Sequence, residues 1–233
     1  RARIHLEIIK KCKEEVGNDF AISIKMNSAD FQKGGFSPED SIQVAKLFSD
    51  SGIDNIEISG GTYEQPRLLG LDKVSINPKR SENRKESTIA REAYFLSYAE
   101  EIAKVVNIPL MVTGGFRTKE GMEAALRDGA CEIVGVGRPL CANPYAIKEL
   151  LAGQIDELPK YEKTLSIGPW WLSPKSPFRL IQAINAFSAQ AWFYQQIKKM
   201  GKGLMPDLTL KPWKAFREDA KADQEAIKEY QNF

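Results

Sequence analysis

The strongest constraint on the fold is the repeated succession of a short apolar run and a helical stretch. Four runs are typical of strands, because they are short, rich in β-branched residues, and bounded by glycine, proline or asparagine. They cover residues 20–26, 55–59, 109–113 and 132–137. Strands that alternate with helices along a chain predict a parallel sheet with helical connections. We therefore expect an α/β fold.

Helical periodicity or helix-start signals accompany these runs. A first helix is expected to end at Gly17, where the apolar spacing stops. The second is expected to begin after Ser37, an N-cap residue, with Pro38 at the first helical position. Further helices are predicted at about residues 87–106, 119–127 and 144–151. The polar stretch 62–85 reads as a long loop at the end of the second strand, and loops of that length are usually functional.

The pattern changes after Gly153. The tail carries the pair Trp170 and Trp171, several prolines, an amphipathic stretch at 178–200 and a charged stretch to residue 233. We predict a first domain at residues 1–153 and a mostly helical C-terminal extension at 154–233, packed on it. A helical stripe in the amphipathic stretch is expected to cover core, with a dimer interface or a lipid contact as the alternative. Its members are Leu180, Ile184, Phe187, Ala191 and Tyr194.

Composition limits the classes of partner. The 233 residues include 33 Lys or Arg and 31 Asp or Glu with interspersed signs, so nucleic acid is not implied as a partner. Three separated cysteines, no CxxC pair and one histidine predict no metal site and favour a reduced, cytoplasmic protein. No apolar run approaches the roughly 18 residues that a membrane span needs. The first residues, without Met, read as the middle of a helix, which suggests a part of a longer protein.

Two glycine-rich segments follow neighbouring predicted strands: MVTGGF at residues 111–116 and VGVGRP at 134–139. Glycines directly after a strand let backbone N–H groups approach an anion, and the helix that follows adds a positive end. Arg138 supplies a guanidinium that can hold phosphate oxygens. Because loops after the last two strands of TIM barrels commonly bind phosphate, the two segments together predict a phosphate site. The alternative is that the glycines only shape turns and Arg138 forms a surface ion pair.

Lys25 lies in the middle of an apolar run, near the end of the first predicted strand. A lysine there must reach water, a carboxylate or a ligand anion, since an unpaired buried charge is costly. One reading places it beside a flavin ring, where a cation stabilises the negative charge of reduction. The other is an ion pair with Glu57 on the next strand, and spacing alone leaves both open.

The chain resembles the C-terminal half of the Old Yellow Enzyme, or NADH:flavin oxidoreductase, family of FMN-dependent TIM-barrel enzymes. The matching segments, in the family's order over about residues 1–153, are RARIHLEIIKKCKEEVG, SIKMNSADF, IEISGGTYEQP, REAYFLSYAEEIAKVVNIPLMVTGGFRT and CEIVGVGRPLCANP. The resemblance implies a (β/α)8 TIM barrel, of which this chain supplies about the last four βα units and a helical C-terminal extension.

The resemblance also implies which residues bind the cofactor FMN. Lys25 matches the basic residue that contacts the flavin ring, usually Arg in this family. Gly114, Gly115 and Phe116 match the first phosphate-contacting turn. Gly137 and Arg138 match the second phosphate-contacting turn. Lysine keeps the charge of arginine but loses its planar fork, so contact with two flavin atoms is less well supported.

The resemblance places the substrate-activating groups of the family, a His-His or His-Asn pair and a Tyr, before residue 1, so the catalytic residues are expected outside this chain. His5 does not replace them, because it lies among apolar positions of the first helix. The implied reaction passes hydride from NAD(P)H through FMN to a small electron-poor acceptor, such as an activated alkene or a quinone. Four strands cannot close an eight-stranded barrel, so pairing with a missing N-terminal half or a homo-oligomer is expected.

Two other readings remain open at the level of sequence. The chain could act as a non-catalytic phosphate-binding or interaction module, or belong to another phosphate-binding TIM barrel. Cys131 and Cys141 are interpreted as packing residues, because neither has a histidine or CxxC partner nearby. Tyr63 and Tyr94 are interpreted as core or rim aromatics, with a position facing the active site as the alternative.

Overall fold

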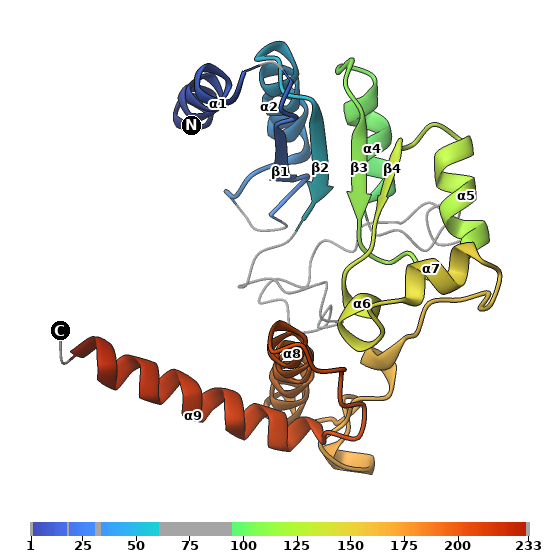
Figure 1. The fold of residues 1–233 in the computed structure, drawn as a ribbon, viewed down its shortest axis with the longest axis vertical. Helices are drawn as coiled ribbons and strands as arrows, with labels where there is room; N and C mark the ends of the chain where they lie inside the picture. Colours follow the sequence, from blue (N-terminus) through green and yellow to red (C-terminus); the bar gives the residue numbers. More distant parts are fainter. Residues whose placement is uncertain (1, 18, 31–33, 61–94, 232–233) are drawn as a thin grey trace. The chain divides into compact units, whose positions relative to one another are not determined.

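The structure is a computed structural model that describes residues 2–17, 19–30, 34–60 and 95–231 (Figure 1). The predicted loop 62–85, the first part of the helix predicted at 87–106, and Tyr63 and Tyr94 lie outside these residues. Two compact units divide the described chain, the first ending at Val136 and the second starting at Gly137. The division between the units lies earlier in the chain than the domain boundary predicted after residue 153. That predicted boundary stays a prediction.

The first unit is built on a four-stranded parallel sheet in the order β1-β2-β3-β4. The strands are β1 (Ser23–Asn27), β2 (Asn55–Ser59), β3 (Leu110–Thr113) and β4 (Ile133–Gly135). One row of register partners crosses the sheet from Lys25 to Glu57, Met111 and Ile133. The α/β fold and the four predicted strands are therefore confirmed, although three strands are shorter than predicted.

Helices connect these strands, as expected of parallel neighbours. The connecting helices are α2 (Pro38–Asp50), α4 (Leu96–Ala103) and α5 (Lys119–Arg127), and α1 (Arg3–Val16) precedes β1. The predicted start of α2 is confirmed, because Ser37 Oγ accepts from Asp40 N at 3.1 Å while the Asp40 carboxylate accepts from Ser37 N. Thr118 Oγ1 caps α5 by accepting from Gly121 N, without the reciprocal bond seen at α2.

The two faces of the sheet differ in burial. Met26, Ile56, Ile58, Leu110 and Val112 point to one face and are buried in a core that also contains residues of α2 and α4. Figure 1 shows these two helices running alongside the strands. Side chains of the other face, including Lys25 and Ile133, are exposed or half-buried. We call this second side the open face.

The second unit is helical in the residues described. It contains α6 (Arg138–Ala142), α7 (Ala146–Leu151), the short 3₁₀ helices η2 (Tyr161–Lys163) and η3 (Trp170–Leu172), α8 (Arg179–Gly201) and α9 (Pro212–Gln231). Its core centres on Trp192 of α8, which is 1% exposed. The Trp192 ring meets Phe193 edge-on, and its Nε1 donates to Leu210 O at 2.9 Å. The predicted helical character of the extension is confirmed.

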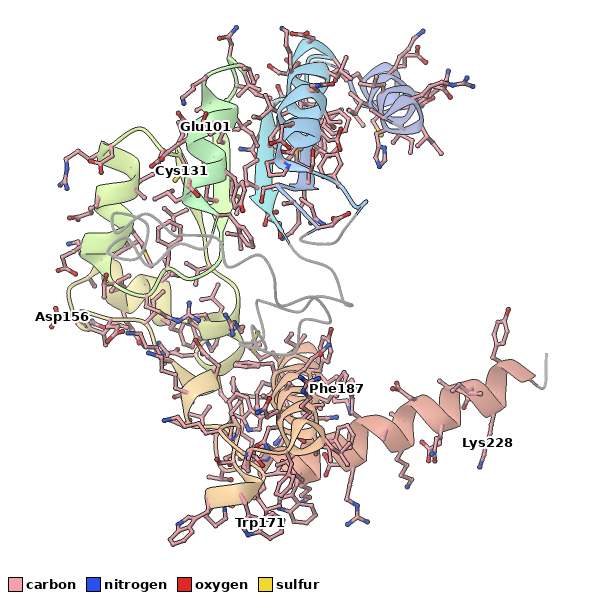
Figure 2. All side chains as sticks on the ribbon, turned by 180° about the vertical axis from the view of Figure 1, so that it is seen from behind. Glu101, Cys131, Asp156, Trp171, Phe187 and Lys228 are labelled. Atoms are coloured by element: carbon pink, nitrogen blue, oxygen red, sulfur yellow. The ribbon has the colours of Figure 1, made fainter. Side chains whose placement is uncertain are left out.

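The predicted buried stripe of α8 is wrong for most of its members. Leu180, Phe187 and Tyr194 are 71%, 56% and 42% exposed (Phe187 is labelled in Figure 2), and only Ala191 is fully buried. The buried face is instead made of Asn185, Ala186, Ser188, Ala191, Trp192, Phe193 and Gln196. Two of its polar residues, Asn185 and Gln196, hydrogen-bond to neighbouring loop backbone, which an apolar periodicity does not detect. Ser188 Oγ is buried without a hydrogen-bond partner among the described residues. No helix in the described segments is long and apolar enough to span a bilayer.

Candidate functional site

The turn after β3 has the backbone geometry that the sequence predicts. Gly114 and Gly115 have φ angles of 122° and 91°, in the region that residues with a Cβ rarely adopt. The pair therefore has to be glycine for a conformational reason. Phe116 follows with its side chain 1% exposed in the core of the first unit. Only the Phe116 backbone is then available to a ligand.

The ends of β3 and β4 lie in direct register and close together, since Thr113 pairs with Gly135. A Cβ built on Gly135 would lie 1.9 Å from Thr113 Oγ1, so only glycine fits at this position. Thr113 Oγ1 is buried and has no hydrogen-bond partner among the described residues. A buried hydroxyl left without a partner is uncommon in native proteins, and here it fits a site that a ligand oxygen completes.

A buried cation lies beside the same turn. Arg117, which directly follows Phe116, is 6% exposed and donates from Nη1 to Phe116 O at 2.7 Å. It thus places positive charge next to the glycine pair. Sequence patterns alone distinguish neither this residue nor Thr113 as a candidate. The available signal was an arginine and a threonine flanking the two glycines and the phenylalanine.

The second predicted half begins at the neighbouring strand end and continues into the second unit. Gly137 has a φ of −117° and open space around a Cβ, so its identity is not required by this backbone. Arg138, the first residue of α6, is half-buried. Within the described chain it has no ion-pair partner, so the predicted alternative of a surface ion pair is not observed.

Lys25 forms the ion pair that the sequence offered as an alternative to a ligand contact. Its Nζ donates to Glu57 Oε1 at 2.6 Å, and the two residues are register partners on the open face. The Glu57 side chain is 20% exposed, whereas that of Lys25 is 56% exposed. The pair leaves much of the lysine accessible, so it does not exclude a ligand contact.

The end of β1 repeats the close approach seen at β3. Ser28 is fully buried, and its Oγ has no hydrogen-bond partner within the described part of the chain. A Cβ on Gly60, after β2, would lie 3.1 Å from this Oγ and 2.5 Å from a Phe95 ring carbon. The carboxyl ends of three strands, β1, β2 and β3, therefore carry small residues, and two of them carry buried hydroxyls.

The remaining polar candidates have structural environments. Cys131, labelled in Figure 2, is a packing residue. It is 2% exposed, and burial raises the pKa of its thiol to about 11, so it is inert at neutral pH. Burial also raises the pKa of the half-buried Cys141. His5 is exposed on α1, with its ring 6.0 Å from that of Phe48. No cluster of His, Cys, Asp or Glu with metal-binding geometry occurs among the described residues.

Comparison with known proteins places these features in a family context. The model of the NADH:flavin oxidoreductase / NADH oxidase family matches residues 1–157. The chain is 38% identical over 156 residues to the NADH-dependent flavin oxidoreductase iliE of Hypocrea jecorina, covering 65% of this chain and 36% of that protein. It is 31% identical over 206 residues to iccE of Talaromyces variabilis, covering 87% and 47%. An NADH oxidase of Thermoanaerobacter brockii is 32% identical, with 85% and 28% covered.

Among solved structures, a complex of 2-naphthoyl-CoA reductase is similar over 67% of this chain and 22% of its own. The TM-score is 0.53 and the identity 25%. The chain thus spans between about a quarter and a half of the length of the curated relatives named above. The family match over residues 1–157 contains the four described strands and both glycine-rich segments.

Proposed function

Because the chain belongs to the NADH:flavin oxidoreductase / NADH oxidase family, we propose that it is the phosphate-binding part of an FMN-dependent oxidoreductase. The proposed reaction transfers hydride from NAD(P)H to an electron-poor small molecule, such as an activated alkene or a quinone. Flavin and NADH are the cofactor and the reductant of this family. When bound, FMN supplies the hydride-accepting and hydride-donating chemistry, while the residues of this chain bind and orient it.

The observation that carries the proposal is the tight pairing of the β3 and β4 ends. Gly114 and Gly115 free the backbone N–H groups of the turn, and the unpartnered hydroxyl of Thr113 lies beside Gly135. Backbone donors, a buried hydroxyl and the nearby Arg117 make a donor set suited to phosphate oxygens. The residues present therefore fit the phosphate group of FMN.

The other proposed cofactor contacts follow from the resemblance. Backbone N–H groups from Gly114 to Phe116 hold phosphate oxygens in the first turn. Gly137 permits close approach of backbone to the phosphate, and Arg138 adds a bidentate charged contact. Lys25 donates a hydrogen bond to the edge of the flavin ring, where negative charge gathers on reduction.

We propose that the active enzyme contains four further βα units, which cover the open face and supply the substrate-activating His-His or His-Asn pair and the proton-donating Tyr. These units would come from further residues of the same polypeptide or from a second chain. The open face of the sheet and the edges at β1 and β4 require such a cover, because exposed parallel strands with one uncovered face are rare.

Cofactor analysis of the purified complete enzyme tests the proposal. We expect a flavin absorption band, release of FMN on denaturation, and anaerobic bleaching of the band by NADH or NADPH. A protein that carries no flavin and does not bind added FMN would contradict the proposed function. A protein that binds FMN but is not reduced by either nucleotide would contradict the proposed hydride donor.

A further inference from the structure

The ion pair between Lys25 and Glu57 lies on the open face of the sheet. We propose that Glu57 is a positioning residue that holds Lys25 for the flavin ring and offsets part of its charge. The inference rests on the proposed FMN function, because it concerns how the lysine acts on the bound flavin. It adds Glu57 to the proposed FMN site, as the residue that positions Lys25 and tunes its charge.

Register fixes the two residues opposite each other. Lys25 and Glu57 are partners in adjacent parallel strands, and their side chains leave the same face of the sheet. The preceding pair on this face, Ser23 and Asn55, is also bonded, with Ser23 Oγ donating to Asn55 Oδ1 at 2.8 Å. Asn55 Nδ2 in turn donates to Pro109 O at 3.1 Å, which ties this row to the third strand. A short ladder of polar pairs therefore crosses the first strands.

The pair stands one step from the carboxyl ends of the strands. The next row is Asn27 with Ser59, two residues further along and about 6.6 Å away. A lysine stem is long enough to reach that edge, which is where ligands of parallel α/β barrels bind. Glu57 is the less exposed partner, with its side chain at 20%, so its carboxylate is the fixed end of the pair.

A fixed carboxylate changes what the lysine does electrostatically. An unpaired ammonium beside the flavin would strongly favour the negatively charged reduced ring. With Glu57 Oε1 at 2.6 Å from Nζ, the pair is close to neutral at a distance, while an N–H of the lysine can still donate to the ring. Glu57 therefore lowers the reduction potential of the flavin relative to a site with an unpaired lysine.

The test compares Glu57→Gln, Lys25→Met and the double variant in the FMN-loaded complete enzyme. Glu57→Gln removes the negative charge and keeps the side-chain shape. We expect it to favour reduced over oxidised FMN by about tenfold, which raises a two-electron potential by about 30 mV. Lys25→Met should shift the potential in the opposite direction. If Glu57 acts through Lys25, Glu57→Gln should change the potential much less once Lys25 is absent, so the double variant should lie closer to Lys25→Met than the sum of the two single shifts.

Glu123→Gln is the matched control, because Glu123 is an exposed carboxylate that pairs with Lys119 along α5. Its potential should equal that of the unchanged enzyme. The dissociation constant of oxidised FMN and the thermal unfolding temperature are measured for every variant. An unchanged potential in Glu57→Gln, with FMN bound and the fold intact, would overturn the inference and leave the proposed function standing.

Other outcomes are equally decisive. Strictly additive shifts in the double variant would show that Glu57 does not act through Lys25, and would also overturn the inference. Failure of the unchanged enzyme to bind FMN would instead contradict the proposed function itself. If Glu57→Gln does not fold, Glu57→Asp replaces it. The shorter side chain keeps the charge but withdraws the carboxylate from Lys25 Nζ. This should weaken the ion pair and the binding of oxidised FMN, and unchanged binding and potential would count against positioning by Glu57.

Discussion

The two units of the molecule bury their interiors with different chemistry. In the first unit, aliphatic side chains such as Ile56, Ile58 and Val112 are fully buried, and the polar residues of the strands stand on the open face. In the second unit, the buried side of α8 mixes Trp192 with Asn185 and Gln196. The first interior is thus held by apolar burial and sheet bonds, and the second by aromatic packing and specific side-chain hydrogen bonds.

The two buried amide side chains of α8, those of Asn185 and Gln196, have defined partners. Asn185 Oδ1 accepts from Ile167 N, and its Nδ2 donates to Leu172 O and Ile181 O, so it ties the loop before α8 to the helix. Gln196 Nε2 donates to Asp207 O, while its Oε1 accepts from Asp207 N at 2.6 Å. Helix α8 is therefore anchored by the hydrogen bonds of its buried side-chain amides. Its exposed apolar residues do not identify the face that it buries.

Trp192→Ala should give the largest effect. The variant removes a ring that is 1% exposed, together with its bond to Leu210 O. We expect the free energy of unfolding of the second unit to fall by about 3–5 kcal/mol, measured by denaturant titration. The control is Trp170→Ala, which truncates a tryptophan that is 87% exposed and should change stability by less than about 0.5 kcal/mol. Equal losses in the two variants would refute this assignment of the core.

Gln196→Leu tests whether hydrogen bonds, rather than apolar contact, hold the second unit. Leucine is more apolar, but it leaves both Asp207 backbone groups without partners. We expect a loss of about 1–3 kcal/mol in unfolding free energy. The neighbouring Gln195→Leu, on a half-buried position, is the control and should have a smaller effect. A stabilised Gln196→Leu would remove the contrast between the units.

Gly135→Ala and Gly137→Ala lie on the two sides of the unit boundary and test two different roles of glycine. The first tests a packing requirement, and the second tests close approach to a ligand. A Cβ at Gly135 meets Thr113 Oγ1, so overpacking should destabilise the first unit by about 1–3 kcal/mol. A Cβ at Gly137 meets nothing within 4 Å, so stability should be nearly unchanged. If Gly137 approaches the phosphate as proposed, its alanine variant should nevertheless weaken FMN binding, measured by flavin fluorescence. Normal FMN binding by Gly137→Ala would remove this residue from the proposed site.

The smallest expected effect concerns pH and the second unit. The Thr209 hydroxyl, followed by Lys199, lowers the pKa of Asp207 from 3.8 to about 2 by hydrogen bonding to the carboxylate. The folded state then favours the ionised form, so this stabilisation is present above about pH 4 and is lost as the pH falls toward 2. Thr209→Val should raise the pKa of Asp207 and move the loss to higher pH. An NMR titration of the Asp207 carboxyl group measures this directly, and an unchanged midpoint would contradict it.

Sequence patterns predicted the strands and helices of the first unit well, because side-chain burial there follows the regular periods of strands and helices. Residues 55–59 and 119–127 coincide with β2 and α5, since burial alternates along the strands and Thr118 supplies a clear N-cap. The glycine pair was predictable because positive φ angles at a strand end demand glycine. The family resemblance is confirmed by the match over residues 1–157.

The same patterns did not predict features that depend on contacts with segments far away in the sequence, because local spacing carries no information about such contacts. The orientation of α8 depends on amide bonds to Leu172 and Asp207, which lie in other segments of the chain. Likewise, the choice between an ion pair and a ligand contact for Lys25 required the register of β1 and β2. Thr113 cannot be identified from the sequence, because a single threonine in a strand gives no signal until the structure shows that its hydroxyl lacks a hydrogen-bond partner.

The proposed binding of the FMN phosphate by the two glycine-rich segments is tested most directly by two dissociation constants. They are those of FMN and of riboflavin, which lacks only the phosphate, for the complete enzyme stripped of flavin. We predict that FMN binds at least about a hundredfold more tightly, since several charge-assisted hydrogen bonds of about 1.5–3 kcal/mol each depend on the phosphate. Arg138→Ala should reduce that ratio by about tenfold or more. Equal affinities for the two flavins, or a ratio that Arg138→Ala leaves unchanged, would contradict the account.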